Sequence, residues 1–190
     1  VKDTDGDNWL GGKTLDNAIV DELLVPYLKD NFSIQSYLDD DEKNILLKDA
    51  LKIEAEKIKI ELSFNQTCDI ISDIGVYPND DNGKEIEIDY TISQSELEKV
   101  VKPIFQKAVD ISLELLKRNN IEGKSLTSLI LVGGPTFSPV LRSLVEKQIK
   151  KPNTSVDPMT VVARGAAIYA TQFEVSEEIV DQTRDTTKIQ

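Results

Sequence analysis

The segment from Glu42 to Phe64 constrains the fold most, because its apolar residues recur at steps of three or four. That spacing predicts one long amphipathic helix with a single buried stripe. The stripe consists of Leu47, Leu51, Ala55, Ile58 and Leu62. Two alternating runs, at about 67–76 and 85–92, follow it and predict an antiparallel hairpin, because strict alternation is typical of half-buried strands. The chain therefore combines long helices with a β-hairpin.

The second half of the chain has a different pattern. The capping box Ser93-Gln-Ser-Glu96 predicts the start of another long helix, which ends near Asn119-Asn120. Leu129-Ile-Leu-Val132 is a continuous apolar run, and such runs are typical of a strand that is covered on both faces. Ser138-Pro139 and Asp157-Pro158 each predict the first residues of a further helix. We therefore predict an α/β protein.

Composition excludes several classes of function. The chain has 22 Lys and Arg against 34 Asp and Glu, a net charge of −12, which argues against nucleic-acid binding. It has no histidine, so it contains no Ser-His pair and no imidazole metal site. The single Cys68 allows no internal disulfide and favours a reducing compartment. No apolar run approaches the roughly 18–20 residues of a membrane span. Because the only methionine is Met159, we expect an interior piece of a longer protein.

An acidic turn near the N-terminus suggests a calcium site. Asp3, Asp5 and Asp7 have the spacing of the first ligands of an EF-hand loop. The twelfth position, which needs a bidentate glutamate, is Thr14, and the sixth is Asn8 rather than glycine. A solvated acidic turn is the favoured interpretation, and we expect no metal-binding residue here.

Two features indicate a ligand site. The first is the Gly133-Gly134 pair between the predicted strand and the helix after Ser138. Glycines before a helix N-terminus let a ligand approach free backbone N–H groups, as nucleotide phosphates do. Such a pair also occurs merely to make a tight corner, and the sequence leaves both interpretations open.

The second feature lies on the long helix. At about 100° per residue, Glu56, Lys59 and Ser63 fall within roughly 60° of one another. Ile53 and Ile60 flank them instead of joining the apolar stripe. A narrow polar set with apolar edges can bind a flat heterocycle that carries hydroxyl groups. The alternative is an ordinary solvated face.

Four segments, in the same order, resemble the DnaK-type, 70-kDa heat-shock chaperones. Gly6–Asp16 resembles the family's GDTHLGGEDFD segment, and Ala55–Ser63 resembles its adenosine-binding helix. Leu131–Pro139 is similar to the LVGGxTRxP turn, and Asp157–Ala167 is similar to the NPDExVAxGAA helix. The resemblance covers nearly the whole chain.

This resemblance implies lobe II of an actin-like ATPase domain, which has a ribonuclease-H-like α/β fold. Residues 1–12 and 107–175 would form its α/β base, and 13–106 a helical and β-hairpin top subdomain inserted in it. Residues 176–190 would form a polar tail or linker. By position, seven residues would bind the nucleotide: Glu56, Lys59, Ile60, Ser63, Gly133, Gly134 and Phe137.

Three residues depart from the family pattern. Phe137 stands where the family has an arginine that covers one face of the adenine, Pro135 fills a small or polar position, and Met159 replaces an aspartate. An aromatic ring can replace a stacked guanidinium. Phe137 could instead pack against the helix that starts at Pro139, and the sequence leaves the two possibilities equal.

The implied function is that of a fragment of a cytoplasmic chaperone ATPase. It would form the adenosine side of an ATP/ADP cleft that gates peptide binding by a separate substrate domain. Partners would be unfolded polypeptide clients, a nucleotide exchange factor and a J-domain co-chaperone. The phosphate-binding and Mg²⁺-linked groups would lie upstream, so we expect no catalytic residue in this chain. The alternatives are a scaffold without ATP turnover and a lobe of an actin-like sugar kinase, although the four motifs do not fit the kinase.

Overall fold

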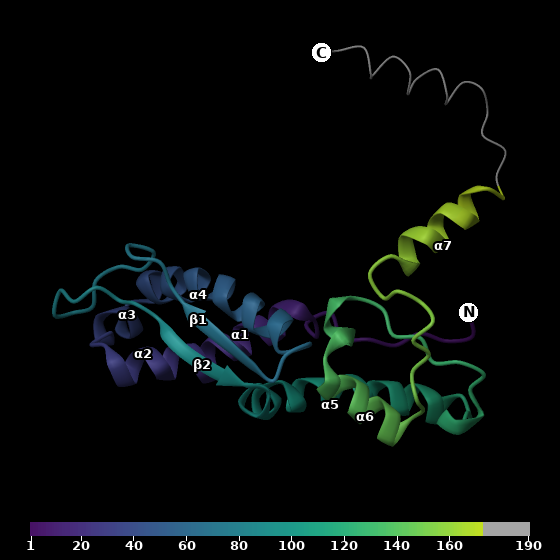
Figure 1. Cartoon of the computed structure of the whole chain (residues 1–190). Coiled ribbons are helices and arrows are strands. Elements are labelled where there is room, and N and C mark those ends of the chain that lie inside the picture. Colours follow the sequence, from purple (N-terminus) through teal and green to yellow (C-terminus); the bar gives the residue numbers. More distant parts are fainter. Residues whose placement is uncertain (173–190) are drawn as a thin grey trace, which may run out of the picture.

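The computed structural model describes residues 1–172, so the predicted tail (176–190) lies outside the described part of the chain. The described residues form seven α-helices and two strands (Figure 1). The helices are α1 (Gly12–Ile19), α2 (Val25–Asn31), α3 (Gln35–Asp39), α4 (Asp41–Glu61), α5 (Gln94–Arg118), α6 (Pro139–Gln148) and α7 (Val161–Ala170). The strands are β1 (Thr67–Ile71) and β2 (Asp89–Ser93). Shorter pieces are a π-helical segment, Val20–Leu24, and two 3₁₀ turns, Gly123–Ser125 and Gly134–Phe137.

The predicted long helix and hairpin are both confirmed, although the strands cover 67–71 and 89–93 rather than 67–76 and 85–92. α4 and its C-cap residue Leu62 bury the whole predicted stripe, and the only two strands of the described chain pair antiparallel, with Cys68 opposite Ile92. These elements and α1 enclose one apolar core, because each presents its apolar face to the same space. Its largest fully buried side chains are Leu15, Ile19, Val20, Leu24, Leu28, Leu51, Ile58, Leu62, Ile70, Ile86, Ile88 and Ile92.

The polar tip of the hairpin is attached to the turn before α3. The Asp80 carboxylate accepts backbone N–H bonds from Ser33 (3.1 Å), Asn82 (2.9 Å) and Lys84 (2.8 Å). Burial acts to raise the pKa of Asp80, but these N–H groups stabilise the charged form more and lower the pKa. Gly83 completes the turn at φ +82°, a conformation that glycine adopts without strain. The tip therefore belongs to the packed region.

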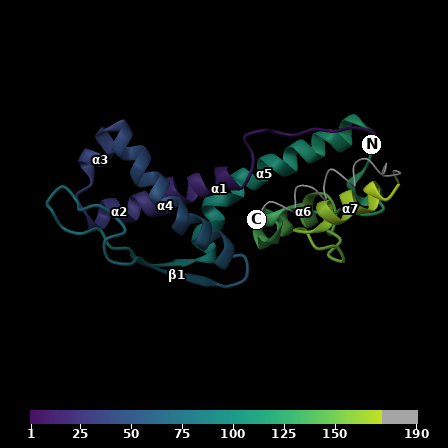
Figure 2. The same ribbon diagram turned by 90° about the horizontal axis from the view of Figure 1, so that it is seen from above.

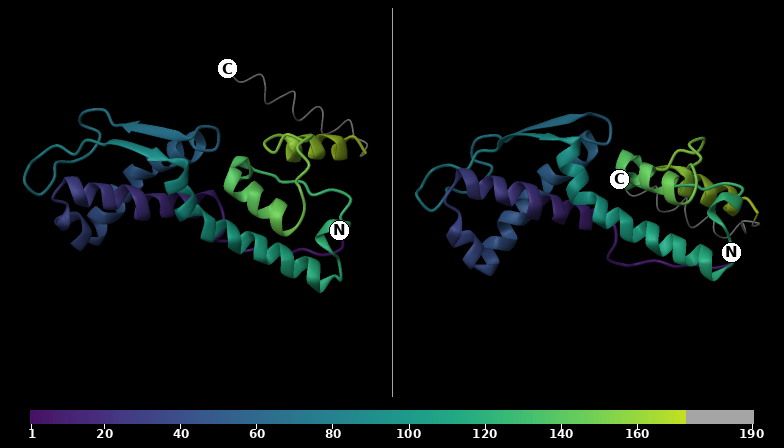
Figure 3. Two further views of the ribbon diagram at one scale, coloured as in Figure 1. Left: turned by 60° about the horizontal axis from the view of Figure 1, so that its bottom comes forward. Right: turned by 90° about the horizontal axis from the view of Figure 1, so that it is seen from below.

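α5 joins this region to the rest of the chain. The Ser93 hydroxyl accepts from the Glu96 N–H, and the Glu96 carboxylate accepts from the Ser93 N–H, which confirms the predicted capping box. The helix continues without a break through Pro103 to Arg118. α6 packs beside its second half (Figures 1 and 3). The expected boundary between 106 and 107 thus falls inside one continuous helix.

The predicted strand at Leu129–Val132 is not a strand in the structure. Leu129 and Leu131 pack against the core, but Ile130 and Val132 are 47% and 46% exposed. A strand needs neighbours that accept and donate ladder hydrogen bonds. In the described part of the chain, this run receives a backbone hydrogen bond from the Asn153 N–H to the Leu129 carbonyl (2.7 Å) but pairs with neither strand. The prediction of a strand covered on both faces was therefore wrong for this chain.

The acidic N-terminal turn binds an arginine. Arg118, the last residue of α5, donates from Nε to Asp3 (2.8 Å) and from Nη1 to Asp5 (2.9 Å). The N-terminal segment extends along α5 to reach it (Figure 2). Hydrogen bonds from Arg118 and Asn119 lower the pKa of Asp3 to about 2. Within residues 1–172, no group of three or more carboxylate or thiol side chains is arranged to hold a metal ion.

α7 lies apart from α5 and α6 (Figure 1). Its apolar side chains Val162, Ile168 and Tyr169 are all exposed. The helix begins at Val161, three residues after the predicted Asp157-Pro158 start, because Asp157 caps the preceding turn through the Met159 N–H (2.9 Å). In the described part of the chain, no helix combines the length and the apolar character that crossing a bilayer requires.

Candidate functional site

A cavity of about 420 Å³ lies between α4, the start of α5 and the Gly134–Phe137 turn. Six of the seven predicted ligand-binding residues line it: Glu56, Lys59, Ile60 and Ser63 from α4, and Gly134 and Phe137 from the turn. Gly133 does not. The remaining wall is mostly apolar and consists of Leu15, Phe64, Leu97, Val101, Phe105, Pro135, Ser138 and Met159. The two sequence features, about 75 residues apart, thus meet at one cavity.

Lys59 is already paired inside the protein. Its Nζ atom lies 2.6 Å from the Asp16 carboxylate of α1, and the two side chains are only 18% and 16% exposed. Ser63 donates its hydroxyl proton to the Lys59 carbonyl (2.9 Å), so its oxygen can accept a bond from a ligand. Sequence reasoning did not select Asp16, although it ends the first family-like segment. The resemblance of that segment to the family was therefore a signal that could have selected Asp16.

The glycine pair serves mainly to shape the turn. Gly133 has φ +95°, which side chains other than glycine rarely adopt, and its N–H donates to the Pro158 carbonyl (3.0 Å). The buried Thr136 hydroxyl donates to the Gly133 carbonyl (2.6 Å). Pro135 has no N–H. The turn therefore offers a ligand fewer backbone donors than a free glycine loop would.

An aromatic pair closes one end of the cavity. The ring centroids of Phe137 and Phe64 are 5.7 Å apart, and the rings are inclined by 48°. Phe64 is 69% exposed, and Ile60, four residues earlier, is 51% exposed. Ile60 lies in the last turn of α4 and Phe64 in the turn that follows the helix, and both line the cavity. Sequence reasoning missed Phe64, although its position four residues after Ile60 was a usable signal.

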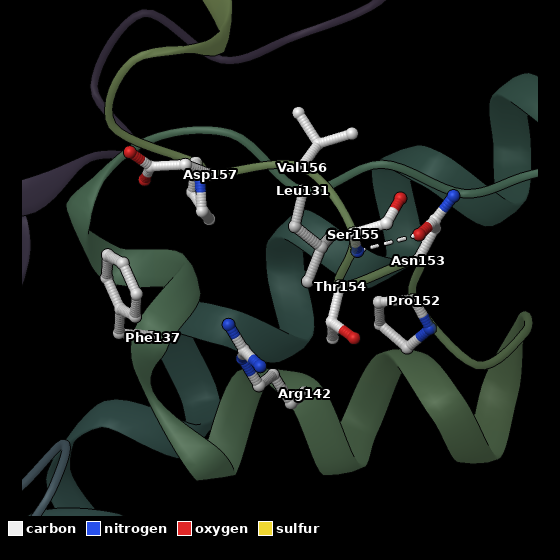
Figure 4. Close-up of a pocket in the computed structure, with 10 residues that line it drawn as sticks. Leu131, Phe137, Arg142, Pro152, Asn153, Thr154, Ser155, Val156 and Asp157 are labelled. Carbon is white, nitrogen blue, oxygen red and sulfur yellow. Dashed lines mark hydrogen bonds between the residues drawn. The ribbon is translucent and has the colours of Figure 1, made fainter.

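A second cavity of about 440 Å³ also has Phe137 in its wall (Figure 4). Arg142 of α6 extends into it toward the ring, and the 152–158 loop forms the opposite wall. Its lining is Leu131, Phe137, Arg142, Pro152, Asn153, Thr154, Ser155, Val156, Asp157 and Pro158. Among the described residues that line the two cavities, only Phe137 lines both.

Comparison with known proteins decides the family. A family model described as "Hsp70 protein" matches residues 1–183, almost the entire chain. The chain belongs to the Hsp70 family. This assigns it to the actin-like ATPase fold class, with which its mixture of helices and strands agrees.

Curated Hsp70 relatives carry the name chaperone protein DnaK. One from Methanothermobacter thermautotrophicus is 36% identical over 172 residues, and one from Mesomycoplasma hyopneumoniae strain 7448 is 37% identical over 169 residues. A third, from Mycoplasmoides gallisepticum, is 32% identical over 171 residues. Each match covers 88% of this chain but only 27% of the relative. The chain thus corresponds to about a quarter of a DnaK-length protein.

Proposed function

We propose that this Hsp70-family chain forms the adenosine side of the ATP/ADP cleft of a chaperone ATPase. It would be lobe II of the actin-like domain, with 13–106 as the top subdomain and 1–12 with 107–175 as the base. The observation that carries the proposal is the single cavity lined by Glu56, Lys59, Ile60, Ser63, Gly134 and Phe137. The wall of this cavity combines polar side chains with partly exposed apolar ones such as Ile60 and Phe64, and this combination suits a heterocycle attached to a sugar.

The residues divide the recognition between them. Ile60 and Phe137 would contact the faces of the base, because they line the cavity from the α4 side and from the turn. Glu56 and Ser63 would accept hydrogen bonds from base or ribose groups, since both side chains carry acceptor oxygens. Lys59, held by Asp16, would donate to a ribose oxygen with its remaining N–H groups. Gly133 would act indirectly, by holding the turn.

The wider function follows from this assignment as part of the same proposal. The natural protein, by which we mean the full-length protein that contains this chain, would hydrolyse ATP with Mg²⁺, using groups outside this chain. It would couple hydrolysis to peptide binding in a separate substrate domain. Its partners would be unfolded polypeptide clients, an exchange factor and a J-domain co-chaperone, in the cytoplasm. The relatives' shared name, chaperone protein DnaK, supports this direction.

Calorimetric titration of ADP into the natural protein tests the proposal. Lys59→Met should weaken ADP binding about tenfold or more, because it removes a cavity donor and leaves Asp16 unpaired. Lys57→Met is the matched control, since Lys57 lies two residues away on α4 and outside the cavity. A wild-type protein that melts cooperatively but binds no ADP would support the scaffold alternative instead.

A further inference from the structure

The contacts of Phe137 extend the site beyond the cavity that holds the predicted residues. One part of its surface lines that cavity with Phe64, and another lines the second cavity with Arg142 (Figure 4). The guanidinium carbon of Arg142 lies over the Phe137 ring, 5.8 Å from its centroid. This distance is within the range of about 6 Å at which a cation is attracted to an aromatic face.

Arg142 is held in this position by the turn itself. Its Nε atom donates to the Thr136 carbonyl (2.7 Å), and Thr136 is buried and bonded to the Gly133 carbonyl (2.6 Å). The residues that form the turn therefore also fix the guanidinium. A planar guanidinium with one N–H committed cannot rotate freely, so the ring meets a cation of defined orientation.

Two physical effects follow for a base stacked on the cavity side of Phe137. The face of an aromatic ring is negative, so two parallel rings repel unless they are offset. A cation over the ring, placed in the second cavity as Arg142 is, draws electron density toward itself and weakens this repulsion. The cation also limits the rotamers of Phe137, which reduces the ordering cost of binding a ligand.

We propose that Arg142 is a positioning residue for the adenine base, acting through Phe137. The inference rests on the proposed function. Phe137 supplies the flat surface in the cavity, and Arg142 supplies the cation over its ring. Arg142 does not line the base cavity, so it makes no direct contact there.

ADP titration of the natural protein, with Arg142→Gln as the test variant, decides whether Arg142 has this role. We expect Arg142→Gln to bind ADP three- to tenfold more weakly, with a melting temperature within about 2 °C of wild type. Lys147→Gln removes a positive charge from the exposed face of the same helix and should bind as wild type does. Arg142→Lys keeps a cation over the ring and should bind more tightly than Arg142→Gln.

A double variant separates positioning from general loosening. Because Arg142 acts through Phe137, Phe137→Ala with Arg142→Gln should bind ADP no more weakly than Phe137→Ala alone. Additive losses, or an Arg142→Gln protein that binds like wild type, would overturn the role of Arg142 and leave the adenosine site in place. If wild-type protein bound no ADP, the proposed function itself would fail, and this inference with it.

Discussion

The hairpin region and the last third of the described chain differ in how completely they bury their apolar residues. Residues 13–106 contain the largest fully buried side chains, and their helices and both strands surround one core. They also expose some apolar side chains, such as Ile53 and Phe64. In residues 121–172 the buried apolar residues are confined to 140–149, and Ile130, Val132, Val162 and Ile168 are exposed. The kind of residue does not explain this difference in burial, because Ile130, Val132, Val162 and Ile168 are as apolar as the buried side chains.

The difference shows that local and non-local elements depend on their surroundings to different degrees. A helix satisfies its own backbone hydrogen bonds, and a hairpin satisfies them between neighbouring strands of one segment. A single extended run such as 129–132 needs ladder partners from elsewhere, and residues 1–172 supply none. We therefore expect stability to be concentrated in residues 13–106, which include the first half of α5.

Substitutions of isoleucine on α4 should give the largest effect. Ile58→Ala should lower the free energy of unfolding by about 2–5 kcal/mol, because it leaves a cavity in a fully buried site. Ile53→Ala is the matched control on the same helix, where Ile53 is 72% exposed and the change should stay within about 0.5 kcal/mol. Urea denaturation followed by circular dichroism measures both. Equal losses would show that the core is not where the structure places it.

The cap of α5 should have an intermediate effect and tests whether the two regions unfold together. Ser93→Ala removes the acceptor for the Glu96 N–H and should destabilise the protein by about 1 kcal/mol. Because α5 spans both regions, the loss should appear in one transition detected by far-ultraviolet circular dichroism and by differential scanning calorimetry alike. Two separate transitions, with only the first shifted, would show that the regions are independent.

Acid should loosen the hairpin tip before the core. The pKa of Asp80 is lowered from its ordinary 3.8, so its carboxylate contributes stability that is complete above about 3.8 and is lost as pH falls through the lower folded value. Melting temperatures measured between pH 6 and pH 2 should therefore fall less steeply at the acid end for Asp80→Asn than for wild type. Identical slopes would exclude Asp80 as a source of the acid dependence.

The smallest effect should come from the extended run. Ile130→Thr should change the free energy of unfolding of the 190-residue chain by less than about 0.5 kcal/mol, since Ile130 is 47% exposed. Leu131→Thr, the adjacent control, should cost more, because Leu131 packs against the core. If Ile130→Thr is much more costly in the natural protein than in this chain, the run gains its partner strands there.

Sequence patterns predicted the helices and the hairpin well, because their signals are local. The stripe of α4 and the capping box at Ser93 each depend on residues within a few positions of one another. The prediction for Leu129–Val132 failed because an apolar run indicates only composition, whereas strand formation depends on partners. The alternation of contact along it, with Leu129 and Leu131 inside, was not visible in four consecutive apolar letters.

The candidate site was predictable in its residues but not in its pairings. Helical spacing and the family resemblance together selected six residues that share a cavity. Neither could show that Asp16 pairs with Lys59, or that Arg142 reaches the ring of Phe137 from one turn into α6. Both contacts join segments that are separate in the sequence or lie on different elements, so they depend on tertiary geometry.

The Lys59–Asp16 pair has a consequence for how a nucleotide would be attracted. The ammonium is neutralised by a partner 2.6 Å away, and the chain as a whole carries a net charge of −12. This face therefore presents no positive potential to a polyphosphate. Salt screens the repulsion between the net negative charge and a polyphosphate, so the contribution of this chain to ADP binding should not weaken as ionic strength rises. If the proposed site is correct, adenosine and ADP would gain the same contacts here, and a weakening of ADP binding by salt would arise from groups outside this chain.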